Sequence, residues 1–212
     1  MTARGWIPDP FPHAVIDGMW PGPFLEAVAA EFPAATDPRW TSAPGPREGG
    51  KLWCDQPSGW GPLVRQAVAE MRSDQARDWL AALTGIGGLV ADTLGGGMHM
   101  TGPGGRLAMH RDFNVHPGAG NLERRLNVLL FLNPEWEKEW GGTLYLGEHK
   151  EIEVLPLAGR MAVFECGEKS WHGHPEPVTG DHWRKSLACY WYAPPRETVA
   201  GHGTIWQDEG AA

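Results

Sequence analysis

The spacing of hydrophobic residues changes about halfway along the chain. Up to about Leu94, apolar side chains recur at every third or fourth position, which is the spacing of amphipathic helices. The pattern predicts helices that begin near Pro23, Pro62 and Asp74. Proline is well tolerated in the first turn of a helix but not in its interior, so Pro33 is expected to end the first helix.

Residues 36–60 separate the first predicted helix from the second. They are rich in Pro, Gly and Trp and predict a long loop. Long loops in compact domains often cover functional sites. Residues 36–60 and residues 113–123 are therefore candidates for a lid over a substrate, with ordinary loop packing as the alternative. A short strand over residues 11–17 is expected ahead of the first helix.

From about Leu94 onwards, short apolar segments alternate with turn residues. The predicted strands cover residues 106–112, 124–132, 143–146, 152–155, 160–164 and 184–192. Many short strands with regular turns are typical of a β-sandwich or jelly roll. The chain is therefore expected to be α+β, with supporting N-terminal helices before a double-sheet barrel. We expect a single domain, with helices and lid loop in residues 1–93, the barrel in 94–193 and a C-terminal tail in 194–212.

Composition and charge narrow the classes of function. The chain has 212 residues, of which 42% are hydrophobic, enough for one domain with a substantial core. Its formal net charge of −8 argues against nucleic acid as a partner, because phosphate contacts need a basic surface. It lacks an apolar run of about 18 residues, so we expect no membrane partner. The first residues lack a secretory signal pattern and the cysteines are widely spaced, which favours a cytoplasmic protein.

The pattern His-x-Asp occurs at His110 and Asp112, and His172 follows much later. Alternate residues of a strand point to the same side, so His110 and Asp112 are expected to share a face. Two imidazoles and one carboxylate suit an iron ion that must keep open positions, whereas a closed zinc site usually has four protein ligands. The pattern also arises by chance. His174 is the alternative third ligand, and we prefer His172 because it directly follows Trp171 at the end of a strand and its connecting loop.

A basic residue follows in the last predicted strand. Alternation places Arg184, Ser186, Ala188 and Tyr190 on one face. An arginine and a hydroxyl two residues apart can bind one carboxylate, and a solvated or ion-paired arginine at a strand end is the alternative. On the predicted strand 124–132, Asn127, Leu129 and Phe131 share a face and could line the same pocket.

Six segments of the second half resemble a known family when they are taken in order. They are residues 104–114, 125–133, 140–142, 159–164, 170–173 and 184–187. In this order and spacing they resemble the Fe(II)/2-oxoglutarate-dependent oxygenase superfamily, in its prolyl-hydroxylase-like branch. The resemblance implies a double-stranded β-helix, or jelly roll, with the metal at its open end. It implies that His110, Asp112 and His172 hold Fe(II).

The resemblance also implies a site for the co-substrate 2-oxoglutarate. Arg184, helped by Ser186, would bind the far carboxylate of this molecule. Some members of the family hold 2-oxoglutarate with a tyrosine on the preceding strand, and the nearest position here is Met100. Asn127 or another polar group would then help to hold 2-oxoglutarate in place of the tyrosine.

The activity implied is hydroxylation by Fe(II), 2-oxoglutarate and O₂, with release of succinate and CO₂. Halogenating relatives have a small residue in place of the carboxylate, so Asp112 favours hydroxylation. The expected substrate is an amino acid, a peptidyl residue or a small natural-product intermediate, which is hydroxylated at an unactivated C–H bond. The alternatives are a peptidyl-prolyl hydroxylase acting on a protein, a cupin-type dioxygenase without 2-oxoglutarate, and a non-enzymatic barrel.

Overall fold

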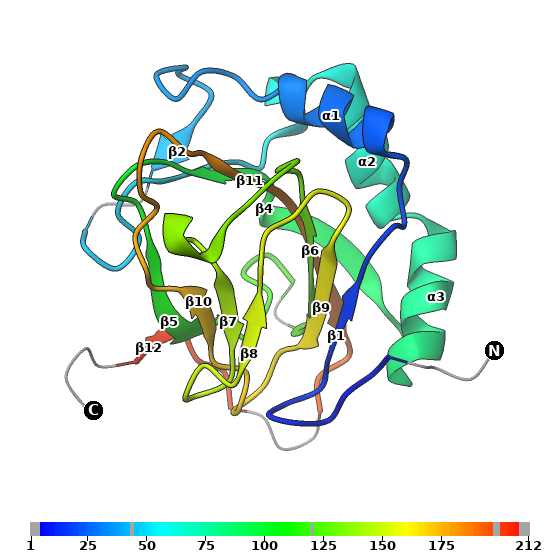
Figure 1. The fold of residues 1–212 in the computed structure, drawn as a ribbon. Coiled ribbons are helices and arrows are strands. Elements are labelled where there is room, and N and C mark those ends of the chain that lie inside the picture. The colour runs from blue at the N-terminus through cyan, green and yellow to red at the C-terminus, as the bar shows by residue number, and fades with distance from the viewer. Residues whose placement is uncertain (1–4, 43–44, 120, 197–199, 208–212) are drawn as a thin grey trace.

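Two antiparallel sheets face each other, and the helices cover the outer side of the larger one (Figure 1). The computed structural model describes residues 5–42, 45–119, 121–196 and 200–207. Within these residues the larger sheet has the strand order β1-β9-β6-β11-β4-β3-β2, and the smaller sheet has the order β12-β5-β10-β7-β8. This arrangement confirms the predicted α+β jelly roll with supporting helices.

The elements have the following bounds. The strands are β1 (His13–Ile16), β2 (Thr41–Ser42), β3 (Lys51–Cys54), β4 (Val90–Thr101), β5 (Leu107–Arg111), β6 (Glu123–Phe131), β7 (Leu144–Leu146), β8 (Ile152–Val154), β9 (Met161–Glu165), β10 (His172–His174), β11 (Arg184–Ala193) and β12 (Ile205–Trp206). The helices are α1 (Gly22–Ala30), α2 (Pro62–Met71) and α3 (Asp74–Thr84), with short 3-10 turns at Pro57–Gly59 and Lys138–Trp140.

The ends of the helices are fixed by local side chains. Pro62 occupies the first turn of α2, and the Glu31 carboxylate accepts hydrogen bonds from the free backbone N–H groups of Leu63 and Val64, at 3.1 and 2.8 Å. A carboxylate at a helix N-terminus satisfies these donors and complements the helix dipole. The Ser73 hydroxyl caps α3 in the same way. The predicted helix boundaries are therefore confirmed to within one or two residues.

The helices pack their apolar faces against the outer face of the larger sheet. Val64, Val68 and Met71 of α2 belong to one buried cluster with Val128 of β6 and Leu187 of β11. Alternate residues of these two strands point into the space between the sheets. The larger sheet therefore has an apolar outer face and an inner face that is available for a site.

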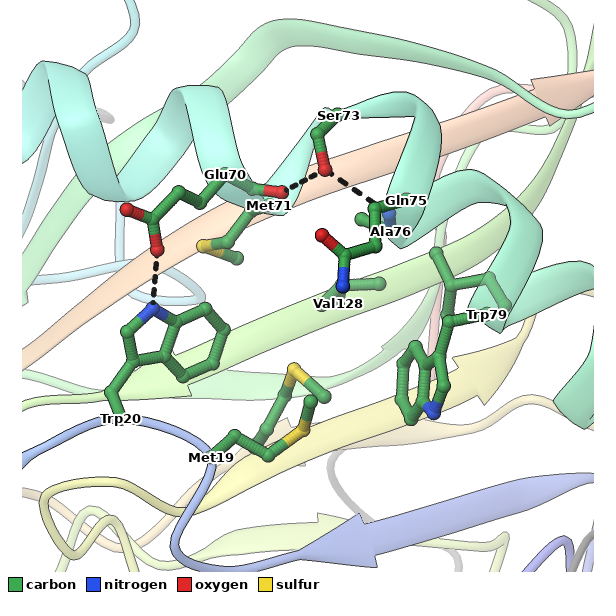
Figure 2. Close-up of a pocket in the computed structure, with 11 residues that line it drawn as sticks. Met19, Trp20, Glu70, Met71, Ser73, Gln75, Ala76, Trp79 and Val128 are labelled. Atoms are coloured by element: carbon green, nitrogen blue, oxygen red, sulfur yellow. Dashed lines mark hydrogen bonds between the residues drawn. The ribbon is translucent and has the colours of Figure 1, made fainter. Parts of the chain in front are cut away.

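A groove opens on the outer side, between the helices and the larger sheet (Figure 2). It has a volume of about 520 Å³, and its lining includes three Met and two Trp side chains, among them Met19, Trp20 and Trp79. The Trp20 indole N–H donates a hydrogen bond of 3.0 Å to the Glu70 carboxylate at its edge. Val128 of β6 also lines the groove, whereas its neighbour Asn127 faces the opposite side of the sheet.

Five strands lie outside the predicted ranges, namely β2, β3, β4, β10 and β12. The expected loop over residues 36–60 is wrong in part, because Lys51–Cys54 forms β3 and pairs with β4. β3 is short, and its extended shape depends on hydrogen bonds to a distant strand. β4 itself contains three consecutive glycines, residues 95–97, which give no alternating pattern. The expected C-terminal tail contains β12, and its last residues, 208–212, lie outside the described residues.

The cysteines Cys54, Cys166 and Cys189 are buried and free, as their wide spacing predicted. Among the residues that the structure describes, no helix has the length and apolar character needed to span a membrane.

Candidate metal centre

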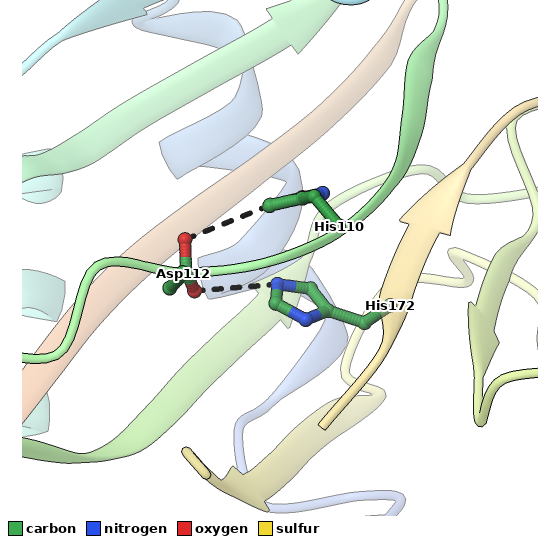
Figure 3. A group of neighbouring side chains, drawn as sticks. All are labelled: His110, Asp112 and His172. Carbon is green, nitrogen blue, oxygen red and sulfur yellow. Dashed lines mark ion pairs between the residues drawn. The ribbon is translucent and has the colours of Figure 1, made fainter. Parts of the chain in front are cut away.

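The candidate metal ligands come from two neighbouring strands of the smaller sheet. His110 lies in β5, Asp112 follows directly after the end of this strand, and His172 begins β10. The register pairs His172 with His110 across the two strands. Paired residues point to the same face, so both imidazoles and the carboxylate converge on one point (Figure 3).

The distances fit a single small cation. The Nε2 atom of His110 lies 3.6 Å from Oδ1 of Asp112, and Nε2 of His172 lies 3.3 Å from Oδ2 of Asp112. The three ligand atoms all lie within 4.8 Å of one another, and both imidazoles are buried. One carboxylate and two imidazoles leave open positions on a six-coordinate ion, which is the donor set of non-haem Fe(II) sites. The side chains therefore fit Fe(II).

Backbone carbonyls fix the orientation of both rings. Nδ1 of His110 lies 2.9 Å from the Ala108 carbonyl oxygen, and Nδ1 of His172 lies 2.8 Å from that of Ser170. A carbonyl oxygen only accepts hydrogen bonds, so each Nδ1 carries a proton, and Nε2 is the atom that offers a lone pair in the neutral ring. Burial and the neighbouring His172 also lower the pKa of His110, which favours the neutral form that binds metals.

A buried arginine and an asparagine support the Asp112 carboxylate. Its Oδ2 accepts a hydrogen bond of 2.7 Å from Asn127, and Arg124 lies 3.1 Å from the same oxygen. Arg124 also donates to the Asn127 side-chain oxygen and lies over the Tyr190 ring. Burial raises the pKa of Asp112, but Arg124 and His172 lower it, and the net result lies well below the usual value. The carboxylate is therefore ionised and held in place.

Arg184 lies in the same cavity as the metal ligands, with Ser186 beside it on the inner face of β11. Its Nε donates a hydrogen bond of 2.7 Å to the Gly142 carbonyl oxygen, and its guanidinium lies over the Phe131 ring. None of the described residues places a carboxylate on Arg184, and burial lowers its pKa to about 9. A buried cation without a counter-charge is costly, and an anionic ligand would relieve that cost.

The structure places the predicted residues in one cavity but gives Asn127 unexpected partners. The cavity is lined by residues of both sheets, including His110, Asp112, His172, Asn127, Arg184 and Ser186. Both polar atoms of the Asn127 amide contact Asp112 or Arg124 rather than the Arg184 side. The Met100 side chain packs in the core on the helix side, and its neighbour His99 lines the cavity instead.

Sequence reasoning missed Arg124 and Trp206. Arg124 shares a face with Asn127, three positions later, because an irregularity interrupts the pairing of β6 with β11. A charged residue at the start of a strand that is apolar on both faces was the available signal. Trp206 of β12 pairs with His110, and their ring centroids lie 5.1 Å apart. A two-residue strand leaves no periodic signal by which Trp206 could have been found.

Comparisons with known proteins agree with this geometry. Residues 96–193 match the family described as the 2OG-Fe(II) oxygenase superfamily. No curated protein sequence matches the chain.

Solved structures show a similar fold. A Pseudomonas putida prolyl-4-hydroxylase aligns with a TM-score of 0.62 and 23% identity, over 87% of this chain and 93% of that chain. A viral collagen prolyl hydroxylase from Paramecium Bursaria Chlorella virus-1 in complex with 2OG has a TM-score of 0.58 and 15% identity, over 87% and 96%. HygX from Streptomyces hygroscopicus, with nickel, 2-oxoglutarate and hygromycin B bound, has a TM-score of 0.59 and 14% identity, over 92% of each chain. At these identities the likeness concerns the fold alone.

Proposed function

Because residues 96–193 match the family described as the 2OG-Fe(II) oxygenase superfamily, we propose that the chain is an Fe(II)- and 2-oxoglutarate-dependent hydroxylase. In this proposal the substrate is an amino acid, a peptidyl residue or a small natural-product intermediate, and the enzyme hydroxylates one of its unactivated C–H bonds. The reaction consumes O₂ and 2-oxoglutarate and releases succinate and CO₂.

One observation carries the proposal. A buried arginine without a carboxylate partner among the described residues shares a cavity with a group of two imidazoles and one carboxylate. A guanidinium binds a carboxylate through two parallel hydrogen bonds, and the open metal positions accept oxygen ligands. The cavity therefore suits an acid with a second carboxylate far from its metal-binding end. A metal dioxygenase without 2-oxoglutarate would need an anionic substrate of its own to use the Arg184 charge.

In this proposal His110, Asp112 and His172 hold Fe(II), which together with 2-oxoglutarate and O₂ supplies the oxidising power for hydroxylation. The other residues position these groups. Arg124 and Asn127 hold the Oδ2 atom of Asp112, so the carboxylate keeps one orientation. Groups that orient metal ligands typically support metal affinity by roughly 10–100-fold.

The proposed substrate class follows from the lining of the cavity and from the ligands of similar folds. The P. putida structure is named a prolyl-4-hydroxylase, and the HygX structure contains hygromycin B, so this fold accommodates both prolyl and small-molecule chemistry in other proteins. In the present cavity, the Tyr190 ring and the apolar Leu129 and Ala188 side chains lie near the metal ligands. These groups favour a compact substrate with apolar carbons. A screen of amino acids and short peptides for substrate-stimulated succinate release tests this assignment.

The test of the cofactor assignment is direct binding. We expect calorimetry under anaerobic conditions to detect 2-oxoglutarate binding to Fe(II)-loaded protein. Arg184→Ala should weaken this binding by roughly tenfold or more, because hydrogen bonds to charged groups are worth about 1.5–3 kcal/mol. Arg160→Ala is the matched control, since Arg160 pairs with Asp17 on another part of the molecule.

Two results would overturn the proposal. The first is that the folded, Fe(II)-loaded protein does not bind 2-oxoglutarate. The second is equal affinity in Arg184→Ala, which would favour the cupin-type reading. Slow succinate formation without added substrate is the expected independent sign of turnover.

A further inference from the structure

The His174 imidazole lies in the cavity but takes no part in the group of metal ligands. His174 is buried, at 3% exposure, and lines the same cavity as Arg184 and Ser186. Its Nδ1 atom is buried and has no hydrogen-bond partner within the described part of the chain. Nearly all buried polar atoms in proteins are hydrogen-bonded, and leaving one unpaired costs about 1–3 kcal/mol.

The position of this ring follows from the strand that carries it. His174 is two residues after His172, so both imidazoles of β10 point into the cavity. Gly173 between them packs tightly on β5, because a Cβ at this position would lie 2.7 Å from the Ala108 carbonyl oxygen. β10 therefore lies close against β5 at this point, and the buried His174 ring faces the cavity.

The surroundings of His174 carry positive charge. Arg184 and Lys51 both act on the imidazole electrostatically, and both line the same cavity. Lys51 is partly balanced by Glu48, at 3.0 Å, whereas Arg184 contacts no described carboxylate. A packing role alone would be filled better by an apolar residue of similar size, because the imidazole leaves an unpaired nitrogen. The cluster of His174, Arg184 and Ser186 instead has the donors that surround a bound carboxylate.

We propose that His174 is a ligand of the co-substrate, and that its ring N–H donates a hydrogen bond to the far carboxylate of 2-oxoglutarate beside Arg184. This inference rests on the proposed function. An imidazole has at least one N–H in either protonation state, so the bond does not depend on its charge. With Ser186, His174 makes this end of the cavity selective for 2-oxo acids that carry a second carboxylate.

The test compares two ligands and two variants by calorimetry on Fe(II)-loaded protein without oxygen. His174→Phe removes the donor and keeps an aromatic ring, whereas His174→Gln keeps a donor. We expect His174→Phe to weaken 2-oxoglutarate binding by about tenfold or more and His174→Gln to weaken it much less. The affinity for 2-oxobutyrate, which lacks the far carboxylate, should be the same in all three proteins.

The possible outcomes separate this inference from the proposed function. If the unaltered protein does not bind 2-oxoglutarate, the proposed function fails and this inference fails with it. If the unaltered protein binds and His174→Phe binds equally well, only the role of His174 is wrong. An equal loss of affinity for both ligands would also contradict it, because the effect would not depend on the far carboxylate.

A measurement on the unaltered protein covers the case in which the variants do not fold. Nitrogen-15 labelling of histidine in Zn(II)-loaded protein allows the ring signals to be followed during titration. We expect the His174 ring N–H to shift and become protected from exchange on addition of 2-oxoglutarate but not of 2-oxobutyrate. An unchanged His174 signal at saturation would overturn the inference.

Discussion

The two faces of strand β11 show how one segment provides both the core and the site. On the outer face, Leu187, Cys189 and Trp191 are buried against the helices. On the inner face, Arg184 and Ser186 line the cavity of the candidate metal centre. The outer face contributes apolar burial, whereas the inner face contains buried polar groups that cost stability unless they find partners. Changes at alternate positions should therefore separate stability from function.

The largest effect is expected from Asp112→Ala. The change removes a candidate ligand and leaves the buried Arg124 without its carboxylate, which costs about 3–5 kcal/mol in comparable buried pairs. Iron affinity should fall by more than about 100-fold, because even supporting groups are worth roughly 10–100-fold. Metal analysis of the purified variant and a succinate assay measure both losses. A variant that keeps one iron per chain and full hydroxylation would show that Asp112 is not a ligand.

Leu187→Ala tests the outer face. Leu187 is fully buried, so the variant should lose about 2–5 kcal/mol in the free energy of unfolding. The neighbouring change Ser186→Ala is its matched control and should cost about 1 kcal/mol or less. Denaturant unfolding measures the loss of stability in both variants. Calorimetry should show a larger loss of 2-oxoglutarate affinity in Ser186→Ala than in Leu187→Ala. If Leu187→Ala and Ser186→Ala lost the same stability and the same affinity, the two faces of β11 would not have separate roles.

Arg124→Met tests whether the charge behind Asp112 supports the metal site. Iron affinity should fall by roughly 10–100-fold, since the Oδ2 atom of Asp112 loses a charged partner. Arg125→Met is the control on the adjacent position, where the arginine pairs with Glu165 instead. Competition with a metal-binding dye compares the two variants. The same affinity in both would mean that Arg124 serves only packing.

The smallest effect is expected for the ion pair of Asp17 and Arg160 near the surface. This pair contrasts with the buried pair of Asp112 and Arg124. The hydrogen bond from Arg160 lowers the pKa of Asp17 despite partial burial. A lowered folded-state pKa adds stability above the unfolded pKa of about 3.9, and that stability is lost as pH falls through the folded value. Asp17→Asn should therefore cost less than about 1 kcal/mol at pH 7, and the cost should shrink as the pH falls below about 4. Urea unfolding across this range checks the trend, and a cost that grows on acidification would contradict it.

Strand alternation allowed much of the inner face to be predicted from the sequence. The expected shared faces of Arg184 with Ser186 and of Asn127 with Leu129 are both present in the cavity. These residues lie in long strands, where a period of two is easy to recognise.

The missed parts depend on contacts between distant segments. Gly97 of β4 has no side chain to reveal a pattern, and it is required because a Cβ there would lie 2.5 Å from the Cys54 carbonyl oxygen. Arg124 faces the site only because the pairing of β6 with β11 is irregular nearby. The free nitrogen of His174 depends on how β10 lies against β5. None of these arrangements is encoded by residue spacing alone.

Under the proposed function, the pairing of His172 with His110 also links metal supply to the stability of the folded chain. The two imidazoles come from strands that meet only in the folded protein, so an ion held by both binds the native state in preference to the unfolded one. By mass action, a free metal concentration one hundred times the dissociation constant adds about 2.7 kcal/mol to the free energy of unfolding. Iron starvation would then increase the unfolded fraction and the exposure of the chain to proteases.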